Sequence, residues 1–228
     1  MEIQIDNETD EEVAQAIATA VSEHLGRDVQ LVEAGETLAV VGPSGAGKST
    51  LLRLLNRIEE PTEGTVHVGG TDYRDVPPTE LRARVGTVPQ DAALRDGTVA
   101  ENVGIGPRLR GESVSRERVA DLLSRVDLAG YGDRPVEELS GGEAQRVAIA
   151  RTVMMDPDVL LLDEPTASLD SAAEREVERL LSDLLATGDR TAVLVTHDER
   201  QADRLADRVA RLEDGTVRAV GRPEEVIA

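Results

Sequence analysis

The chain has 228 residues, of which 39% are apolar, and its 45 acidic against 25 basic residues give a formal net charge of −20. It contains no cysteine, which excludes disulfides, zinc–thiolate sites, iron–sulfur clusters and thiol nucleophiles. No apolar run approaches the roughly 18 residues of a membrane span, and the N-terminus is acidic where a secretory signal is basic, so we expect a soluble, cytoplasmic protein with one substantial core.

Residues 1–34 are predicted to form a strand, a helix and a second strand. The strands are expected at 2–6 and 28–32. The helix prediction depends on Thr9 and Glu12 at capping-box spacing, on apolar residues along one face, and on a glycine just past the end. With a β-rich insert farther along the chain, these elements predict an antiparallel β subdomain around 1–36 and 62–75.

The next segment is predicted to be a buried strand, a glycine-rich loop and a helix. Thr37–Val41 is wholly apolar after its first residue, and four leucines follow between positions 51 and 55. The β-rich insert comes next, with a strand at 65–68 and a Gly69-Gly70 turn that leads to Tyr73.

The second half divides into a helical segment and an alternating α/β segment. Residues from about 91 to 138 are polar, arginine-rich and helical in period, with glycines as breaks, which predicts a separate helical subdomain. Continuous apolar strands then alternate with helices, as is typical of a parallel sheet covered on both faces. The predicted elements are helices at 143–155 and 171–186, strands at 159–162 and 191–196, and a hairpin of 208–212 with 216–219.

A phosphate-binding motif lies between the first apolar strand and its helix. The sequence from Gly42 to Ser49 fits G-x-x-x-x-G-K-[ST], whose glycines let backbone N–H groups turn toward a phosphate chain. Lys48, the only lysine of the chain, can reach the β and γ oxygens, and Ser49 can ligate Mg²⁺. The predicted nucleotide-binding residues of this segment are Gly42, Pro43, Ser44, Gly45, Ala46, Gly47, Lys48, Ser49 and Thr50.

Two carboxylates follow the predicted strand at 159–162. They are Asp163 and Glu164, at the edge of a parallel sheet where ligands bind. With a phosphate loop on another strand of that sheet, Asp163 is expected to hold Mg²⁺ through water. Glu164 is expected to orient or deprotonate the attacking water.

A second candidate anion site lies upstream of that strand. The residues are Leu139-Ser140-Gly141-Gly142-Glu143, a hydroxyl and two glycines at the start of a predicted helix. With this motif, the chain from about Gly35 to Pro223 resembles the ATP-binding subunits of ABC transporters. The resemblance implies an α/β P-loop NTPase with a RecA-like parallel-sheet core, formed by a single ABC-type domain over 1–228.

The resemblance implies how the remaining site residues act. In that family two copies dimerise head to tail, and Ser140, Gly141 and Gly142 of one copy close on the γ-phosphate of ATP held by the other. Gln90 matches the glutamine that contacts Mg²⁺ and the attacking water. Asp170 ends the loop that contacts the partner copy, and His197 matches the residue that contacts the γ-phosphate and positions Glu164.

The same resemblance implies a separate membrane permease, with or without a solute-binding protein, and a place on the inner face of the cell membrane. Asn56-Arg57 and the segment 97–103 resemble importers of phosphate or other oxyanions and certain metal-ion exporters. A soluble ABC ATPase without a permease remains an alternative. A GTPase would need a second lysine for its base-reading motif, and a nucleic-acid surface would need a denser basic cluster.

Two compositional features bear on base recognition and on the solvent. The family stacks adenine on an aromatic ring, but residues 1–41 contain no Phe, Tyr or Trp. His24 is the only ring there that could stack on the base. The alternative interpretation is that His24 is simply a solvent-facing helix residue. The acidic, lysine-poor composition is what we expect of a halophilic protein that stays hydrated in concentrated salt, with an ordinary acidic surface as the alternative.

Overall fold

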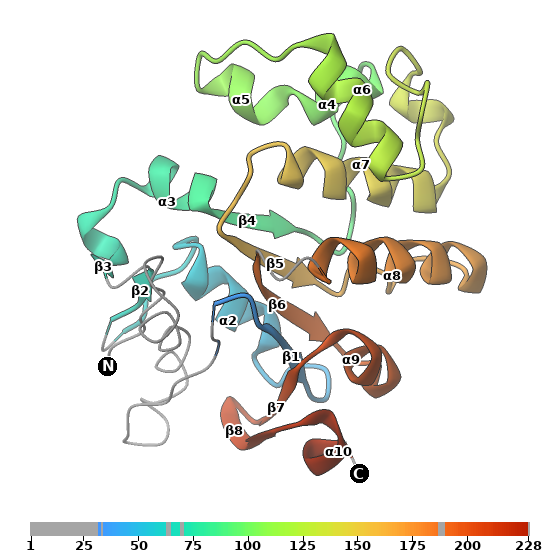
Figure 1. Ribbon diagram of the computed structural model, residues 1–228. Helices are drawn as coiled ribbons and strands as arrows, with labels where there is room; N and C mark the ends of the chain where they lie inside the picture. Colours follow the sequence, from blue (N-terminus) through green and yellow to red (C-terminus); the bar gives the residue numbers. More distant parts are fainter. Residues whose placement is uncertain (1–31, 33, 63–64, 69–70, 187–189, 228) are drawn as a thin grey trace.

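The core of the molecule is one six-stranded sheet, seen in a computed structural model that describes residues 32, 34–62, 65–68, 71–186 and 190–227 (Figure 1). Its strand order is β4-β5-β6-β1-β7-β8, and every neighbouring pair is parallel except β7 with β8. The strands are β1 (Thr37–Val41), β4 (Val85–Val88), β5 (Val159–Asp163), β6 (Thr191–Thr196), β7 (Arg208–Glu213) and β8 (Thr216–Gly221). The predicted parallel α/β core is confirmed.

Helices and a small hairpin surround this sheet. The hairpin pairs β2 (His67–Val68) with β3 (Thr71–Asp72). The helices are α2 (Lys48–Leu55), α3 (Pro78–Arg84), α4 (Val99–Val103), α5 (Ile105–Leu109), α6 (Arg116–Arg125), α7 (Gly141–Val153), α8 (Ser171–Leu185), α9 (Glu199–Leu205) and α10 (Pro223–Val226), with 3-10 turns at Tyr73–Asp75 and Val136–Glu138. Within the described residues, none of these helices has the length and apolar content that crossing a bilayer requires.

Both faces of the central strands β1, β5 and β6 are buried, because successive side chains of each strand enter opposite cores. In β1, Ala39 and Val41 join the core beneath α7 and α8, whereas Leu38 and Val40 join the core beneath α2. Tyr73 is wholly buried in the second core. The sheet is thus held rigidly between two helical layers, which fixes the positions of the loops at its edge.

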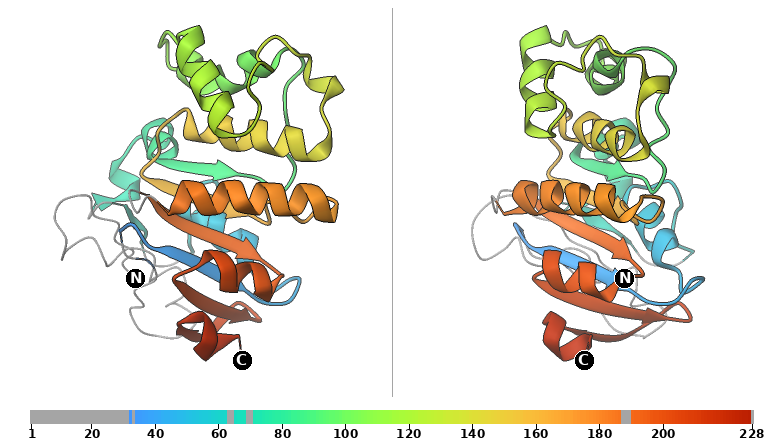
Figure 2. Two further views of the ribbon diagram at one scale, coloured as in Figure 1. Left: turned by 45° about the vertical axis from the view of Figure 1, so that its right-hand side comes forward. Right: turned by 90° about the vertical axis from the view of Figure 1, so that its right-hand side faces the viewer.

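The segment from α4 to α6 forms a tier above α7 (Figure 2). Its apolar side chains, among them Val103 and Leu123, continue the core beneath α7. The buried Asn102 amide closes the turn before α4 by donating to the carbonyls of Arg95 and Thr98 at 2.8 and 3.0 Å. The predicted helices of 91–138 are present, and their division into a separate subdomain stays a prediction.

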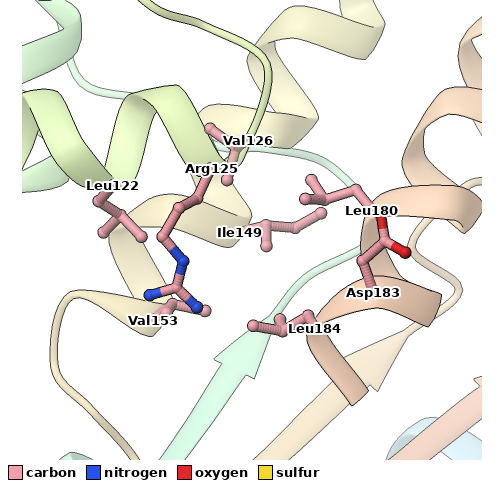
Figure 3. Close-up of a pocket in the computed structure, with 8 residues that line it drawn as sticks. All are labelled: Leu122, Arg125, Val126, Ile149, Val153, Leu180, Asp183 and Leu184. Carbon is pink, nitrogen blue, oxygen red and sulfur yellow. The ribbon is translucent and has the colours of Figure 1, made fainter. Parts of the chain in front are cut away.

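A cavity of about 160 Å³ marks the boundary between α6, α7 and α8. Its walls are mainly apolar, with Arg125 and Asp183 as the charged lining residues (Figure 3). No residue of the phosphate motif or of the predicted catalytic set lines it.

The structure corrects several predicted boundaries. The strand expected at 65–68 is only His67–Val68, and the helix expected from 143 begins at Gly141, because Ser140 caps it. Helices α3, α9 and α10 and strand β4 were not predicted; they are short and carry little periodicity. The elements predicted within 1–31, including His24 on its helix, lie outside the described residues.

Candidate active site

Strand register brings the predicted residues to one edge of the sheet. Val41 at the end of β1 pairs with Thr196 at the end of β6, and Val195 of β6 pairs with Asp163 at the end of β5. The residues that follow these strand ends therefore emerge side by side. Gly42, Glu164 and His197, each from a different stretch of sequence, meet at the carboxyl edge, where open parallel sheets bind ligands.

The loop from Gly42 to Gly47 has a backbone that only glycine tolerates at two points. At Gly42, with φ of 155°, an added Cβ would lie 2.1 Å from the carbonyl oxygen of Leu212. Gly47 takes the left-handed conformation, with φ of 99°, and N-caps α2 without a side-chain cap. The first N–H groups of α2 are thus left to an anion, and no acidic residue lies in the first turn.

Lys48 is held inside this loop. Its side chain is 6% exposed, and its ammonium group donates to the carbonyl oxygens of Gly42 and Pro43 at 2.8 and 3.1 Å. Glu164 Oε1 lies 3.9 Å from Lys48 Nζ. The single lysine therefore directs its charge toward the loop that would wrap a phosphate chain.

The residues expected at Mg²⁺ are assembled as oxygen donors. Ser49 Oγ donates to Asp163 Oδ1 at 3.1 Å. Burial raises the pKa of Asp163, an effect that the Ser49 hydrogen bond and the Lys48 charge partly offset. A hydroxyl beside a half-buried carboxylate supplies two oxygen ligands, which a hard divalent cation prefers.

Glu164 has strained backbone and a fixed side chain. Its φ is 44°, in the left-handed region, while its N–H donates to the carbonyl of Val195 at 2.9 Å. Its Oε2 lies 2.8 Å from His197 Nδ1. His197 is 64% exposed and Glu164 20% exposed, so the histidine faces solvent while the carboxylate is turned toward the loop. This is the arrangement expected of a base and the residue that orients it.

Gln90 lies two residues beyond the end of β4, whose Val88 pairs with Leu162 of β5. It is therefore next to the Asp163 edge, and its side chain is exposed. The sequence did not predict the two residues of α7 that hold the loop around Gln90. Gln145 donates to the carbonyl of Pro89 at 3.0 Å, and Arg151 donates to the carbonyls of Ala92 and Ala93.

The Ser140 motif forms a capped helix start. Ser140 Oγ accepts from the N–H of Glu143 at 3.3 Å, and Glu143 Oε2 accepts from the N–H of Ser140 at 2.7 Å. Gly142 is packed so closely that a Cβ would lie 2.7 Å from the Ala173 side chain, whereas Gly141 is exposed. Ser140 and Gly141 thus face outward, and the structure does not join them to the Lys48 loop within one copy.

Asp170 has a second, structural role. Its carboxylate caps α8 by accepting from the N–H groups of Ala172 and Ala173 at 2.9 and 3.1 Å, and these bonds lower its pKa. Two residues earlier, Ser168 Oγ donates to Asp91 beside the Gln90 loop at 3.4 Å. The predicted nucleotide role of Asp170 stays a prediction.

A hollow of about 350 Å³ opens beside Glu164 and His197. Glu174 and Asp198 also line it, and with Glu178 they form an acidic group. Two of these three carboxylates are already bonded, since Glu178 accepts from Gln201 and Arg204, and Asp198 caps α9. Glu174 and Asp198 therefore contribute acidic side chains to the wall of the hollow.

Comparisons with known proteins agree with this geometry. The family model described as ABC transporter matches residues 28–167. ABC transporter I family member 17 of Arabidopsis thaliana is 46% identical over 84% of this chain and 73% of its own length. Sulfate/thiosulfate import ATP-binding protein CysA 2 of Rhizobium meliloti (strain 1021) is 42% identical over 87% of this chain, which spans only 56% of that protein.

A solved structure supports the same assignment. The chain aligns with cbiO1 from Clostridium perfringens, described as part of the ABC transporter complex cbiONQ, at a TM-score of 0.80 and 29% identity, covering 99% of this chain and 89% of that one. Sequence, fold and the residues at the sheet edge all agree. The chain therefore belongs to the ABC transporter family and is one of its P-loop ATPase domains.

Proposed function

We propose that two copies of this chain bind two Mg·ATP head to tail, hydrolyse them, and drive solute transport through a separate membrane permease. The observation that carries the proposal is the sheet edge, where Lys48, the Ser49–Asp163 pair and the Glu164–His197 pair lie within reach of one triphosphate. The outward-facing Ser140 and Gly141 have no phosphate to contact within their own copy, which is why a second copy completes the site.

Each residue has a distinct part in the hydrolysis. Lys48 and the N–H groups of α2 hold the β- and γ-phosphates, and Ser49, Asp163 and Gln90 hold Mg²⁺, directly or through water. When bound, Mg²⁺ neutralises charge on the phosphate oxygens. Glu164 accepts a proton from water whose oxygen attacks the γ-phosphorus, and the bond to the bridging β–γ oxygen breaks to release ADP. His197 keeps the Glu164 carboxylate aimed at that water.

The names of two similar proteins favour one class of transporter. CysA 2 of Rhizobium meliloti (strain 1021) is named for sulfate and thiosulfate import, and cbiO1 is described as part of a transporter complex. With the oxyanion-importer resemblance of the segment 97–103, this favours an oxyanion importer with a solute-binding protein. The chain would then lie on the inner face of the membrane through the permease.

The surface charge supports a further part of the proposal, adaptation to concentrated salt. The chain carries a net charge of −20, and its basic residues other than Lys48 are all arginine. Molar salt shortens the Debye length to roughly 3 Å and screens repulsion among carboxylates. We infer that the protein is halophilic.

A hydrolysis assay tests the enzymatic part directly. Purified chain should release phosphate from ATP in the presence of Mg²⁺, and Glu164→Gln should lower kcat by at least about a hundredfold while ATP still binds, because general-base loss costs on the order of 10²–10⁴. His197→Ala should lower kcat less. Hydrolysis that persists in Glu164→Gln would remove Glu164 from the mechanism, and copurification of the chain with no membrane protein from its source would favour the soluble alternative.

A further inference from the structure

The acidic residue of the Ser140 motif lies where a negative charge opposes the proposed function. Glu143 is three residues from Ser140, in the first turn of α7, and Ser140 is the residue proposed to meet the γ-phosphate of the partner copy. An uncompensated carboxylate there would repel a triphosphate. The structure shows how this charge is compensated.

Two side chains from the preceding loop bind one oxygen of that carboxylate, Oε1. Tyr131 donates its hydroxyl to Glu143 Oε1 at 2.9 Å, and Arg134 Nη1 lies 3.4 Å from the same oxygen. The Arg134 guanidinium also stacks on the Tyr131 ring, 4.8 Å from its centroid. The other oxygen, Oε2, accepts from the N–H of Ser140. These bonds hold the pKa of Glu143 at about 2, so the group stays ionised.

The loop that carries the pair is itself fixed. The N–H of Val99 donates to the carbonyl of Arg134 at 3.0 Å, and the N–H of Ala100 donates to the carbonyl of Gly132 at 2.9 Å. The Tyr131 ring packs against the core beneath α7. Tyr131 and Arg134 are therefore preorganised by α4 before any partner arrives, and they bind Glu143 without rearrangement.

We propose that Tyr131 and Arg134 are positioning residues for the Ser140 motif. Both side chains hold the ionised Glu143 carboxylate in place, and the Arg134 guanidinium balances its charge, which leaves the Ser140 hydroxyl free to donate outward to the γ-phosphate of the partner copy. This inference rests on the proposed head-to-tail dimer. It predicts that Tyr131 and Arg134 affect closure of the dimer and leave binding of ATP to the Lys48 loop of one copy unchanged.

A double-mutant cycle between Tyr131 and Glu143 tests the inference. Tyr131→Phe keeps the packed ring and removes only the hydroxyl, and it should raise KM for ATP by about tenfold with little change in kcat, the effect of one hydrogen bond to a charged group. In the Glu143→Gln background, where no charge needs compensation, the same change should cost no more than about twofold. ATP binding to the monomer should stay at the wild-type value.

Tyr73→Phe is the matched control, because Tyr73 is the only other tyrosine and its buried hydroxyl has no hydrogen-bond partner among the described residues. It should leave KM unchanged. A purely structural role for Tyr131 would lower the melting temperature equally in both backgrounds without moving KM, and that result would overturn the inference.

Measuring ATP-dependent dimerisation in the Glu164→Gln background separates the two proposals. If the Glu164→Gln protein does not dimerise with Mg·ATP, the proposed function fails and this inference fails with it. The Glu164→Gln protein could instead dimerise at the same protein concentration with and without added Tyr131→Phe. That result would support the proposed dimer and refute the role of Tyr131. An increase of about tenfold in that concentration supports both.

Discussion

The starts of α2 and α7 are opposite solutions to the same problem, a helix N-terminus that meets phosphate. Helix α2 is N-capped by Gly47, with no side-chain cap and no acidic residue in its first turn. Helix α7 is N-capped by Ser140 with a complete capping box and has Glu143 in its first turn. The start of α2, the open end, offers free N–H groups. The start of α7, the capped end, has satisfied part of its N–H groups internally.

The difference follows from what each end is proposed to bind. The open end would hold a whole triphosphate and needs every donor it has, including the ammonium of Lys48. The capped end would meet only one phosphate, held by another copy, and needs a rigid hydroxyl more than it needs spare donors. Its capping box fixes Ser140 before the copies meet. The box also brings in the Glu143 carboxylate, which Tyr131 binds and whose charge Arg134 balances.

The largest expected effect comes from removing the charge at the open end. Lys48→Ala should reduce hydrolysis by at least about a thousandfold, because the Lys48 ammonium is held inside the loop by two carbonyl oxygens and charge stabilisation dominates phosphoryl transfer. Steady-state hydrolysis with a circular dichroism melt as the folding control measures this. Near-normal turnover in folded Lys48→Ala protein would mean that the open end is not the nucleotide site.

The capped end predicts a dependence of stability on pH. The pKa of Glu143 is lowered from 4.5 to about 2 in the folded chain. Its ionised form therefore contributes stability above pH 4.5, roughly 3 kcal/mol at most, and that contribution is lost as pH falls from 4.5 toward 2. Urea melts of wild type and Glu143→Gln should differ most at pH 7, with the gap narrowing by about 1.4 kcal/mol per pH unit below 4.5. A gap that stays constant from pH 7 to 3 would show that the bonds to Glu143 do not stabilise the fold.

The open end is also predicted to read phosphates and not bases. Lys48, Ser49 and Asp163 contact only the triphosphate and Mg²⁺ in the proposed site, and residues 1–41 contain no Phe, Tyr or Trp for stacking, so His24 is the only ring there. Loss of stacking is worth roughly 1–3 kcal/mol, or about five- to 150-fold in affinity. Competition binding of ATP, GTP and ITP should therefore show weak discrimination among the three bases. His24→Ala should weaken that discrimination further. Strong ATP selectivity that survives His24→Ala would contradict this.

Salt is expected to have the smallest effect, and to act on the surface more than on either helix start. From about 0.1 to about 3 M KCl the Debye length falls from roughly 10 Å to a few Å, so repulsion within a chain of net charge −20 weakens and the melting temperature should rise by several degrees. Thermal melts across that range measure it. A flat or falling melting temperature would identify an ordinary acidic surface.

Local sequence predicted the open end more fully than the capped one. The glycines, Lys48 and the strand before them lie within a dozen residues, and the apolar strands Val159–Asp163 and Thr191–Thr196 predicted where Glu164 and His197 emerge. The partners of Glu143 could not be predicted, because Tyr131 and Arg134 reach Glu143 only through the fold of the chain from 131 to 143. The same is true of Arg151, which binds carbonyls 58 and 59 residues away.

The most direct test of the central claim, that the two helix starts meet across a dimer, is size-exclusion chromatography of Glu164→Gln with light scattering. With Mg·ATP the protein should elute as a dimer and without nucleotide as a monomer, because the phosphates stay bound while water activation is lost. Ser140→Ala in the same background should raise the protein concentration needed for the dimer. A monomer under both conditions, or a dimer that forms equally well without ATP, would contradict the account.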